Sequence, residues 1–495
     1  MAVGGRHQEV VGGCGVTVQF QIKLIELNRC HLVKPVHNNI RVRLNLMTLC
    51  TELLLWTCRK LRQWDMHVRM HVLFYDKAPV MPFDCWHTQQ GQRKERIMNK
   101  PAIEGGTPVR ETKIYYGHQY IDDADIKAVV EVLKSDNLTC GPKINELEDK
   151  LCRLTGARYA VVCSNGTAAL HMAAMAAGVG EGDEVITTPI TFAASANCAL
   201  YCGARPVFAD IDPETYNIDP ERVEAAITER TKAVVAVDYT GQSVELDRLT
   251  EICKKHGLTL IEDGAHVIGT KYKGRANGSI SDMTTFSFHP VKTVTGGEGG
   301  AVLTNSEALY KKLLLYRAHG ITRDEGQMEH EPDGSWYYEQ VALGFNYRMT
   351  DIQAALIISQ LDKLPVFRQR RKEIVARYNE AFSKVPGLFV QKEIPDSDTT
   401  RHLYILRIVP EKLTIDRKQF FEALAAENVC CNVHYIPTYY FPYYEKLGYQ
   451  RGLCPNAEKL YEEIISLPLY YAMTDEDVES VIEAVRKIAV YYEKK

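Results

Sequence analysis

Hydrophobic and polar positions follow two alternating periods from about residue 122 onward. Short apolar runs, typical of buried strands, lie at 159–163, 184–187, 206–209, 233–237, 258–261, 283–287 and 300–304. Apolar residues at helical spacing predict helices at 122–134, 168–177, 192–202, 220–228 and 246–256. Such alternation is typical of a mostly parallel sheet with helices on both faces. The pattern predicts an α/β fold whose large domain covers residues 98–349.

The pattern changes at Thr350, a suitable helix N-cap, from which helical spacing continues to about Arg377. The elements predicted after it are strands at 402–409 and 429–435 and a final helix that begins after Thr474. We therefore expect a connecting helix and a smaller C-terminal α+β domain over residues 350–495.

Residues 1–97 differ from the rest in composition. They carry 14 basic against 7 acidic side chains, so that the remainder of a chain with net charge −4 carries −11. A basic nucleic-acid arm would need a helix pair or an aromatic platform, and neither is recognisable. A zinc module could use Cys50, Cys58, His67, His71, Cys85 and His87 as ligands. These residues do not include the paired C-x-x-C spacing that is typical of zinc modules, which argues against this interpretation.

A third interpretation is that residues 1–97 were never selected as protein. The codons of residues 92–97 can form an almost pure purine run directly before the ATG of Met98, as in a bacterial ribosome-binding site. We therefore expect Met98 to be the natural start and residues 1–97 to be a non-native, poorly ordered extension.

Composition excludes several classes of protein. No run of about 18 apolar residues is present, so we expect no membrane span, and the first residues lack the order of a secretory signal. The net charge of −4 argues against nucleic acid as the partner. We expect a cytoplasmic protein whose 14 cysteines are reduced thiols.

Polar residues follow the run at 159–163, at the sheet edge where ligands bind in doubly wound folds. In Ser164-Asn165-Gly166-Thr167, the glycine permits a tight turn and the helix that follows offers free N–H groups to a phosphate. The alternative is an ordinary N-cap provided by Ser164 or Thr167 alone.

Three further residues are candidates for chemistry. Asp263 ends a buried strand, where a carboxylate needs a cation or donors, if only those of a structural salt bridge. Lys292 precedes the glycine-rich run 296–300, and burial there would lower the pKa of its amine, although most loop lysines are solvated. Phe192 could stack on a planar cofactor or belong to the core.

Taken in order, these motifs are specific: a phosphate cradle, an aromatic residue, Asp263 with His266 three residues later, and Ser287-x-x-x-x-Lys292 followed by G-G-E-G-G. The set resembles the DegT/DnrJ/EryC1/StrS family of pyridoxal-phosphate-dependent sugar aminotransferases, which have the fold-type-I architecture. The resemblance extends from Ile114 to the C-terminus and includes the stretches 135–142 and 343–355.

This resemblance implies a cofactor, pyridoxal 5′-phosphate, and a role for each matched residue. Lys292 is implied to bond to the cofactor aldehyde and later to move the substrate proton, and Asp263 to pair with the pyridinium nitrogen. Asn346 is implied to reach the phosphate of a neighbouring subunit, in a homodimer with shared active sites. The other implied contacts are His266 near the phenolic oxygen, Phe192 on the ring, and Gly166, Thr167 and Ser287 on the phosphate.

Stretches 116–121, 237–243 and 336–339 resemble most closely the branch of pseudaminic acid biosynthesis. The implied reaction transfers the amino group of L-glutamate to the C4 ketone of a UDP-linked, N-acetylated 4-keto-6-deoxy sugar. The candidates for the sugar-nucleotide pocket are Tyr116, His434 and Tyr435, whose alternative role is ordinary packing in the small domain.

Other functions stay open at this point. The motifs around the cofactor do not separate this substrate from sugars of the 4-amino-arabinose or 4-amino-fucose type. The related 3-dehydratases carry a histidine where this chain has Lys292. A non-catalytic regulatory protein could use the same fold as a binding module. We expect no metal site, no nucleic acid and no membrane among the partners.

Overall fold

The computed structural model of the protein describes residues 100–494. Residues 1–97 and Met98 lie outside the described residues, and so do the zinc, nucleic-acid and extension hypotheses that concern them. None of the helices between residues 100 and 494 has the length and apolar character needed to cross a membrane.

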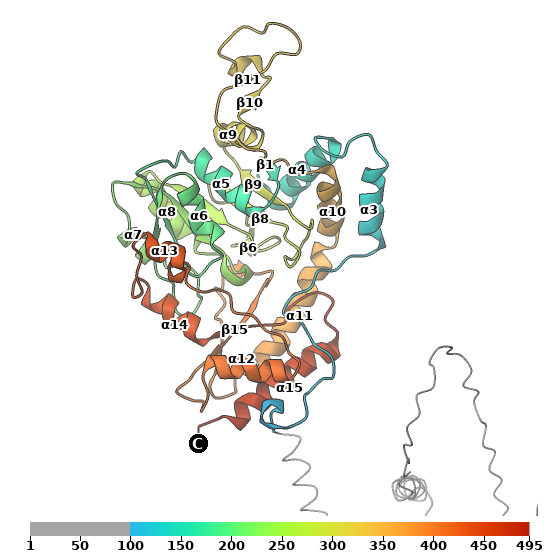
Figure 1. The fold of residues 1–495 in the computed structure, drawn as a ribbon, viewed down its shortest axis with the longest axis vertical. Coiled ribbons are helices and arrows are strands. Elements are labelled where there is room, and N and C mark those ends of the chain that lie inside the picture. Colours follow the sequence, from blue (N-terminus) through green and yellow to red (C-terminus); the bar gives the residue numbers. More distant parts are fainter. Residues whose placement is uncertain (1–99, 495) are drawn as a thin grey trace, which may run out of the picture. The chain divides into compact units, whose positions relative to one another are not determined.

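A seven-stranded sheet forms the centre of the large domain. Its strands are β1 (Tyr159–Cys163), β2 (Glu184–Thr187), β3 (Arg205–Phe208), β4 (Thr231–Val237), β5 (Thr259–Asp263), β8 (Met283–Ser287) and β9 (Gly300–Thr304). They are arranged in the order β1-β9-β8-β5-β4-β2-β3, of which Figure 1 labels β1, β9 and β8. The strands from β8 to β3 are parallel, whereas β9 runs antiparallel to both of its neighbours. The large, mostly parallel sheet is confirmed.

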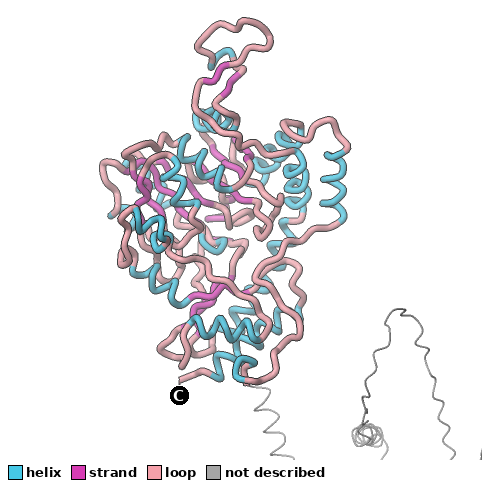
Figure 2. Tube along the Cα trace, in the orientation of Figure 1, coloured by secondary structure: helices cyan, strands magenta, loops and turns pink. Residues whose placement is uncertain are grey.

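Helices cover both faces of this sheet (Figure 2). They are α4 (Pro142–Thr155), α5 (Gly166–Ala176), α6 (Ala194–Tyr201), α7 (Pro220–Ala225), α8 (Leu246–His256) and α9 (Glu307–Arg317). The helix α3 (Asp123–Leu133) packs against α10 (Asp351–Asp362) instead. Successive strand residues point to opposite faces, so Val235 packs in the core with α5 and α6 while Val234 packs in the core with α8. Both faces of the strands are therefore buried, as their continuous apolar runs require.

The long helix predicted from Thr350 is two helices, α10 (Asp351–Asp362) and α11 (Leu364–Phe382). Thr350 is the N-cap, as predicted, and its hydroxyl accepts a hydrogen bond from the N–H of Gln353. The helix breaks at Lys363 because Pro365 has no N–H and its ring clashes with the carbonyl four residues earlier. The domain boundary at residue 350 stays a prediction.

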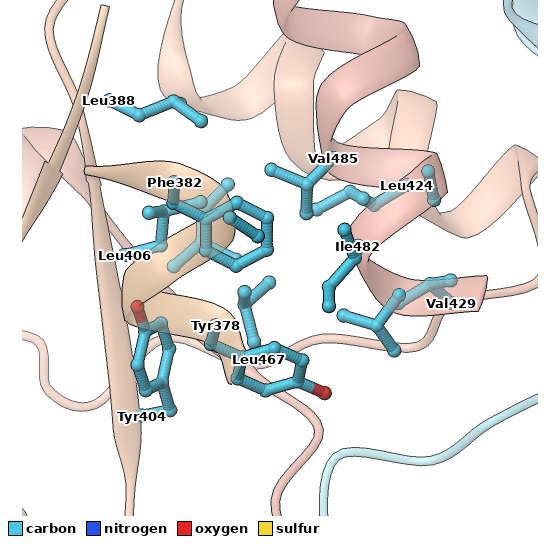
Figure 3. Packing of buried hydrophobic residues seen from close by; sticks show 14 of the residues in the cluster. Tyr378, Phe382, Leu388, Tyr404, Leu406, Leu424, Val429, Leu467, Ile482 and Val485 are labelled. Atoms are coloured by element: carbon cyan, nitrogen blue, oxygen red, sulfur yellow. The ribbon is translucent and has the colours of Figure 1, made fainter. Parts of the chain in front are cut away.

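The small domain is built on a three-stranded antiparallel sheet. Its elements are β12 (Leu388–Val390), β14 (Tyr404–Ile408), β15 (Ile464–Leu467), α12 (Arg417–Ala426), α13 (Pro442–Lys446), α14 (Pro455–Glu463) and α15 (Asp475–Tyr491). Figure 3 shows the core between sheet and helices, where Tyr378 and Phe382 of α11 meet Leu406 of β14 and Ile482 and Val485 of α15. The predicted strand 402–409 corresponds to β14.

The strand predicted at 429–435 is wrong. The segment is irregular and makes only two isolated bridges, Val429 with Ile114 and Asn432 with Ser466. The place beside β14 is taken by β15 instead. Because the backbone of this segment bonds to two different neighbours, it forms no ladder, and its last side chains turn toward the cavity described below.

Short elements complete the described chain. The strands β10 (Ile321–Thr322) and β11 (Glu339–Gln340) form a hairpin that projects from the large domain (Figure 1). The strands β6 (Lys271–Tyr272), β7 (Arg275–Ala276) and β13 (Ser397–Asp398) form a small sheet. The 3-10 turns are η1 (Ala102–Glu104), η2 (Tyr239–Gly241), η3 (Glu325–Gln327) and η4 (Thr438–Tyr440).

Candidate active site

A cavity of about 1140 Å³ lies beyond the carboxyl ends of β1, β2, β5 and β8. Segments far apart in the sequence supply its wall: the start of α5, the turn before α6, the ends of β5 and β8, and the irregular segment 432–436 of the small domain. Ten of the eleven residues predicted for the site line it: Tyr116, Gly166, Thr167, Phe192, Asp263, His266, Ser287, Lys292, His434 and Tyr435. The topological position is the one at which open α/β sheets bind ligands.

Lys292 lies in the loop that follows β8, and its backbone N–H donates to the carbonyl of His289 at 2.9 Å. Burial lowers the pKa of its amine to about 8, and the charge of Asp263 opposes this shift. An amine with this pKa is neutral in roughly a tenth of the molecules at pH 7 and in about half at pH 8, and a nucleophilic lysine requires this neutral form.

Asp263 ends β5 and is almost fully buried. Its Oδ2 accepts a hydrogen bond from the hydroxyl of Ser195 at 2.6 Å, and its Oδ1 accepts one from the N–H of Ala265 at 3.2 Å. Burial raises the pKa of Asp263, while the bond from Ser195 and the charge of Lys292 act in the opposite direction. A buried carboxylate with few donors is suited to a cationic N–H partner in the cavity.

His266 lies one turn beyond Asp263, buried beside the small domain. Its Nε2 is 3.3 Å from the hydroxyl of Tyr435, and its ring centroid is 4.5 Å from that of His402. Burial and the nearby charge of Lys292 hold the pKa of His266 well below its usual range, so the ring is neutral. Its Nδ1 has no hydrogen-bond partner among the described residues, which leaves a buried polar atom available to a ligand.

The start of α5 forms an anion cradle with the end of β8. A Cβ added to Gly166 would lie 2.9 Å from the Cβ of Ser287, and one added to Gly300 would lie 2.3 Å from the carbonyl oxygen of Asn165. Both glycines are therefore needed for this close approach. The N-cap is Asn165, whose Oδ1 accepts from the N–H of Ala168 at 2.8 Å, rather than the Ser164 or Thr167 of the simpler alternative.

Because Asn165 caps only one N–H, the N–H groups of Gly166 and Thr167 at the first helical positions have no partner inside the helix. They lie beside the hydroxyl of Ser287 in the wall of the cavity. The cradle therefore has donors for a phosphate, and the buried Nδ1 of His266 has no hydrogen-bond partner among the described residues. These features fit a phosphorylated, planar pyridine ligand.

The remaining predicted residues occupy the rim and the small-domain wall. Phe192 lies in the turn before α6 with 64% of its surface exposed, so it is not part of the core. The rings of Tyr116 and His434 are 5.3 Å apart, and Nδ1 of His434 is 2.8 Å from the hydroxyl of Ser466. Asn346 is exposed and does not line the cavity of its own chain.

Two further cavity residues, which contact Asp263 and His266, were not predicted as site residues from the sequence. Ser195 is a donor to Asp263, and its only signal was a position one helical turn after Phe192. His402 lies just before β14, its ring is tilted by 42° against that of His266, and its Nδ1 also has no partner among the described residues. Nothing in the local pattern around His402 distinguished it from a strand residue.

The sequence profile of the DegT/DnrJ/EryC1/StrS aminotransferase family matches residues 119–486. The chain belongs to this family. The resemblance predicted from the ordered motifs is confirmed, and the protein is an aminotransferase rather than a non-catalytic binding module.

The chain matches two curated relatives over nearly the whole length of each. The spore coat polysaccharide biosynthesis protein SpsC of Bacillus subtilis is 43% identical over 375 residues, which are 75% of this chain and 96% of SpsC. The UDP-4-amino-4,6-dideoxy-N-acetyl-beta-L-altrosamine transaminase of Campylobacter jejuni is 38% identical over 384 residues, which are 76% of this chain and 99% of that protein.

Solved structures of the family share the fold. PseC of Helicobacter pylori, an aminotransferase of pseudaminic acid biosynthesis, is 34% identical with a TM-score of 0.71, over 77% of this chain and 100% of PseC. A Streptococcus pneumoniae protein described as a sugar aminotransferase, in its PLP form, is 33% identical with a TM-score of 0.71, over 77% and 99% of the two chains. The predicted fold-type-I architecture is confirmed.

Proposed function

We propose that this aminotransferase transfers the amino group of L-glutamate to the C4 ketone of a UDP-linked, N-acetylated 4-keto-6-deoxy sugar. Pyridoxal phosphate is the cofactor, as predicted, and when bound it supplies an electron sink for the carbon that gains or loses a proton. The observation that carries the proposal is the convergence of Lys292, Asp263 and His266 on one cavity that has a phosphate cradle at its end.

Lys292 has two tasks in this reaction. Its neutral amine is the attachment point for the cofactor aldehyde, and its pKa of about 8 makes that form accessible. When the substrate displaces it, the same amine takes a proton from the α-carbon of glutamate and later delivers one to C4 of the sugar. The side of C4 that faces Lys292 therefore sets the configuration of the new amine.

The other chain residues hold the cofactor for this proton transfer. The carboxylate of Asp263 would keep a proton on the pyridine nitrogen, and His266 would donate to the phenolic oxygen. The N–H groups of Gly166 and Thr167 and the hydroxyl of Ser287 would hold the phosphate, and Phe192 would cover the ring. We assign Asn346 to the phosphate of the partner subunit, in a homodimer with shared sites.

The sugar nucleotide would enter along the small-domain wall, where Tyr116, His434 and Tyr435 present aromatic faces and hydrogen-bonding atoms. The C. jejuni transaminase and PseC support a UDP-linked sugar of pseudaminic acid biosynthesis. The similarity to SpsC favours a second candidate, another nucleotide-linked keto-sugar of a surface polysaccharide.

A panel of UDP- and dTDP-linked 4-keto sugars, each incubated with the holoenzyme and glutamate, tests the proposal. We expect 2-oxoglutarate and the UDP-linked 4-amino sugar to form in equal amounts, with the UDP-linked N-acetylated substrate preferred. Preference for a dTDP-linked sugar would support the second candidate. Absence of turnover with every keto-sugar would contradict the proposed function.

A further inference from the structure

Two buried carboxyl groups lie directly behind the candidate active site. Asp238 follows β4 and Glu262 precedes Asp263 in β5, and both side chains are fully buried. Because successive strand residues face opposite sides of a sheet, Glu262 points away from the face that Asp263 presents to the cavity. Neither Asp238 nor Glu262 lines the cavity, so neither belongs to the site described above.

The hydrogen bonds of the two groups are unequal. Glu262 accepts three from neutral donors: the amide of Asn277 at 2.6 Å and the hydroxyls of Ser281 at 2.9 Å and Thr284 at 2.7 Å. Asp238 accepts one at Oδ1, from the N–H of Val244 at 2.8 Å. Its Oδ2 is buried without a hydrogen-bond donor among the described residues. An ionised carboxylate in that position would leave a charged oxygen uncompensated.

A proton on Asp238 resolves this imbalance. The charged groups that act on Asp238 are Glu262 and Asp263, both from β5 and both acidic, while the groups around Glu262 are neutral donors. Burial and the negative charge of Glu262 raise the pKa of Asp238 well above its usual range. Two carboxyl groups in contact hold one proton between them for the same reason in other proteins.

We propose that Asp238 is neutral in the folded protein, that its Oδ2–H donates to Glu262, and that this bond makes Asp238 a positioning residue for the transaminase site. The part that concerns catalysis rests on the proposed function. The pair then carries one negative charge behind Asp263 instead of two. A second charge there would favour protonation of Asp263, which has to stay ionised to hold the ring nitrogen.

Asp238 is connected to the cavity by residues 238–240, the segment that directly follows β4. Its N–H donates to the carbonyl of Asp263 at 3.2 Å, which ties the ends of β4 and β5 together. Two residues on, the carbonyl of Thr240 accepts from the N–H of His402 at 2.8 Å, and the hydroxyl of Tyr239 donates to the carbonyl of His434. Fixing Asp238 therefore fixes two cavity-lining residues of the small domain relative to Asp263.

The variants Asp238→Asn and Asp238→Ala separate a proton-bearing group from a merely space-filling one. The amide of asparagine can donate to Glu262 and accept from Val244, so we expect kcat/KM within about twofold of the wild type. Alanine removes both bonds, and we expect kcat/KM to fall by about 10-fold or more because the segment shifts. The matched control is Asp183→Asn, a half-buried aspartate that accepts from the N–H of Gly180 and has no carboxyl partner.

Stability against pH gives a readout that does not depend on activity. When folding raises the pKa of a carboxyl group, the free energy of unfolding decreases as pH rises above the unfolded pKa of about 4. An asparagine does not titrate, so the variant does not show this decrease. We compare the thermal unfolding midpoints of Asp238→Asn and the wild type. The difference, variant minus wild type, should increase by about 2 °C or more between pH 5 and pH 8.

Infrared spectroscopy of the holoenzyme in H₂O and D₂O tests the proton directly. We expect a band of a buried, protonated carboxyl group that is present in the wild type and lost in Asp238→Asn. A missing band, a pH-independent midpoint difference, or equal loss of activity in the asparagine and alanine variants would overturn the proposal. If the wild type transaminates no keto-sugar, the proposed function fails, while the band and the midpoints still decide the protonation of Asp238.

Discussion

The hydroxyl of Ser195 donates to Oδ2 of Asp263 over 2.6 Å, in a buried position at the start of α6. This bond favours the ionised form of Asp263 against the effect of burial, which raises the pKa of the carboxyl. Ser195 also lies 2.7 Å from the hydroxyl of Thr191, so its orientation is fixed from two sides. Ser195 therefore links Thr191, next to Phe192 in the cavity wall, to Asp263, the carboxylate assigned to the cofactor nitrogen.

Replacement of Ser195 tests this link. In Ser195→Ala the pKa of Asp263 should rise, since one of the groups that lower it is gone. We expect the affinity for pyridoxal phosphate to fall by about 10-fold, the worth of one hydrogen bond to a charged group. A fluorescence titration of the apoenzyme measures it. Ser480→Ala, which removes a hydroxyl of α15 that bonds to the carbonyl of Glu476 and does not line the cavity, is the control. Equal affinity in Ser195→Ala and the wild type would contradict the role of Ser195.

The pKa of Lys292 predicts how cofactor uptake depends on pH. The amine must be neutral to attack the aldehyde, so the rate of incorporation into the apoenzyme should rise with pH through a midpoint near 8. The charge of Asp263 raises the pKa of Lys292, and Asp263→Asn should therefore move the midpoint to lower pH. Stopped-flow absorbance follows the rate. A midpoint near the usual lysine value would show that Lys292 is not desolvated. An upward shift in Asp263→Asn would show that the charge of Asp263 does not raise the pKa of Lys292.

Gly166 is expected to tolerate no side chain. Alanine at a first helical position would normally favour the helix by up to about 1 kcal/mol. Here its Cβ would lie 2.9 Å from Cβ and 3.1 Å from Oγ of Ser287, and such crowding costs about 1–3 kcal/mol. We expect Gly166→Ala to weaken cofactor binding by about 10-fold, measured by equilibrium dialysis. Gly180→Ala, where no atom lies within 4 Å of the added Cβ, should bind as the wild type does.

The hypothesis that Met98 is the natural start has its own test. The described chain is anchored soon after that position, since both carboxylate oxygens of buried Glu427 accept backbone N–H groups, from Ala102 and Val109, at 2.8 Å. We expect a protein that begins at Met98 to match the full chain in unfolding midpoint and in kcat/KM. A loss of either in the shorter protein, or a natural chain whose mass includes Trp56, would refute the hypothesis.

Apolar periodicity predicted the central sheet well because its inner strands are buried on both faces, as in β4, where 233–237 read as a continuous apolar run. The prediction was wrong where local pattern competes with tertiary contacts. The segment 429–435 has strand-like composition, but its backbone bonds to Ile114 and Ser466 on different elements. The break at Lys363 follows from Pro365, a signal present in the sequence but outweighed by the apolar spacing around it.

The candidate site was predicted from residues that directly follow strands, and the structure brings Lys292, Asp263 and His266 to one cavity. Ser195 and His402 act through contacts across 68 and 136 positions of the chain, to Asp263 and His266 respectively, and no local spacing encodes such contacts. Asn346 differs again, because its assigned role needs a second subunit, and it stays a prediction.

The most direct test of the central claim is to locate the cofactor on the chain. The holoenzyme is reduced with borohydride, which makes the bond between the cofactor aldehyde and a lysine amine permanent, and its peptides are then analysed by mass spectrometry. The account predicts the mass of one cofactor on Lys292, and none in Lys292→Ala, which should also lose transamination and the near-visible absorbance. Cofactor attached to another lysine, or a Lys292→Ala protein that keeps its activity, would contradict it.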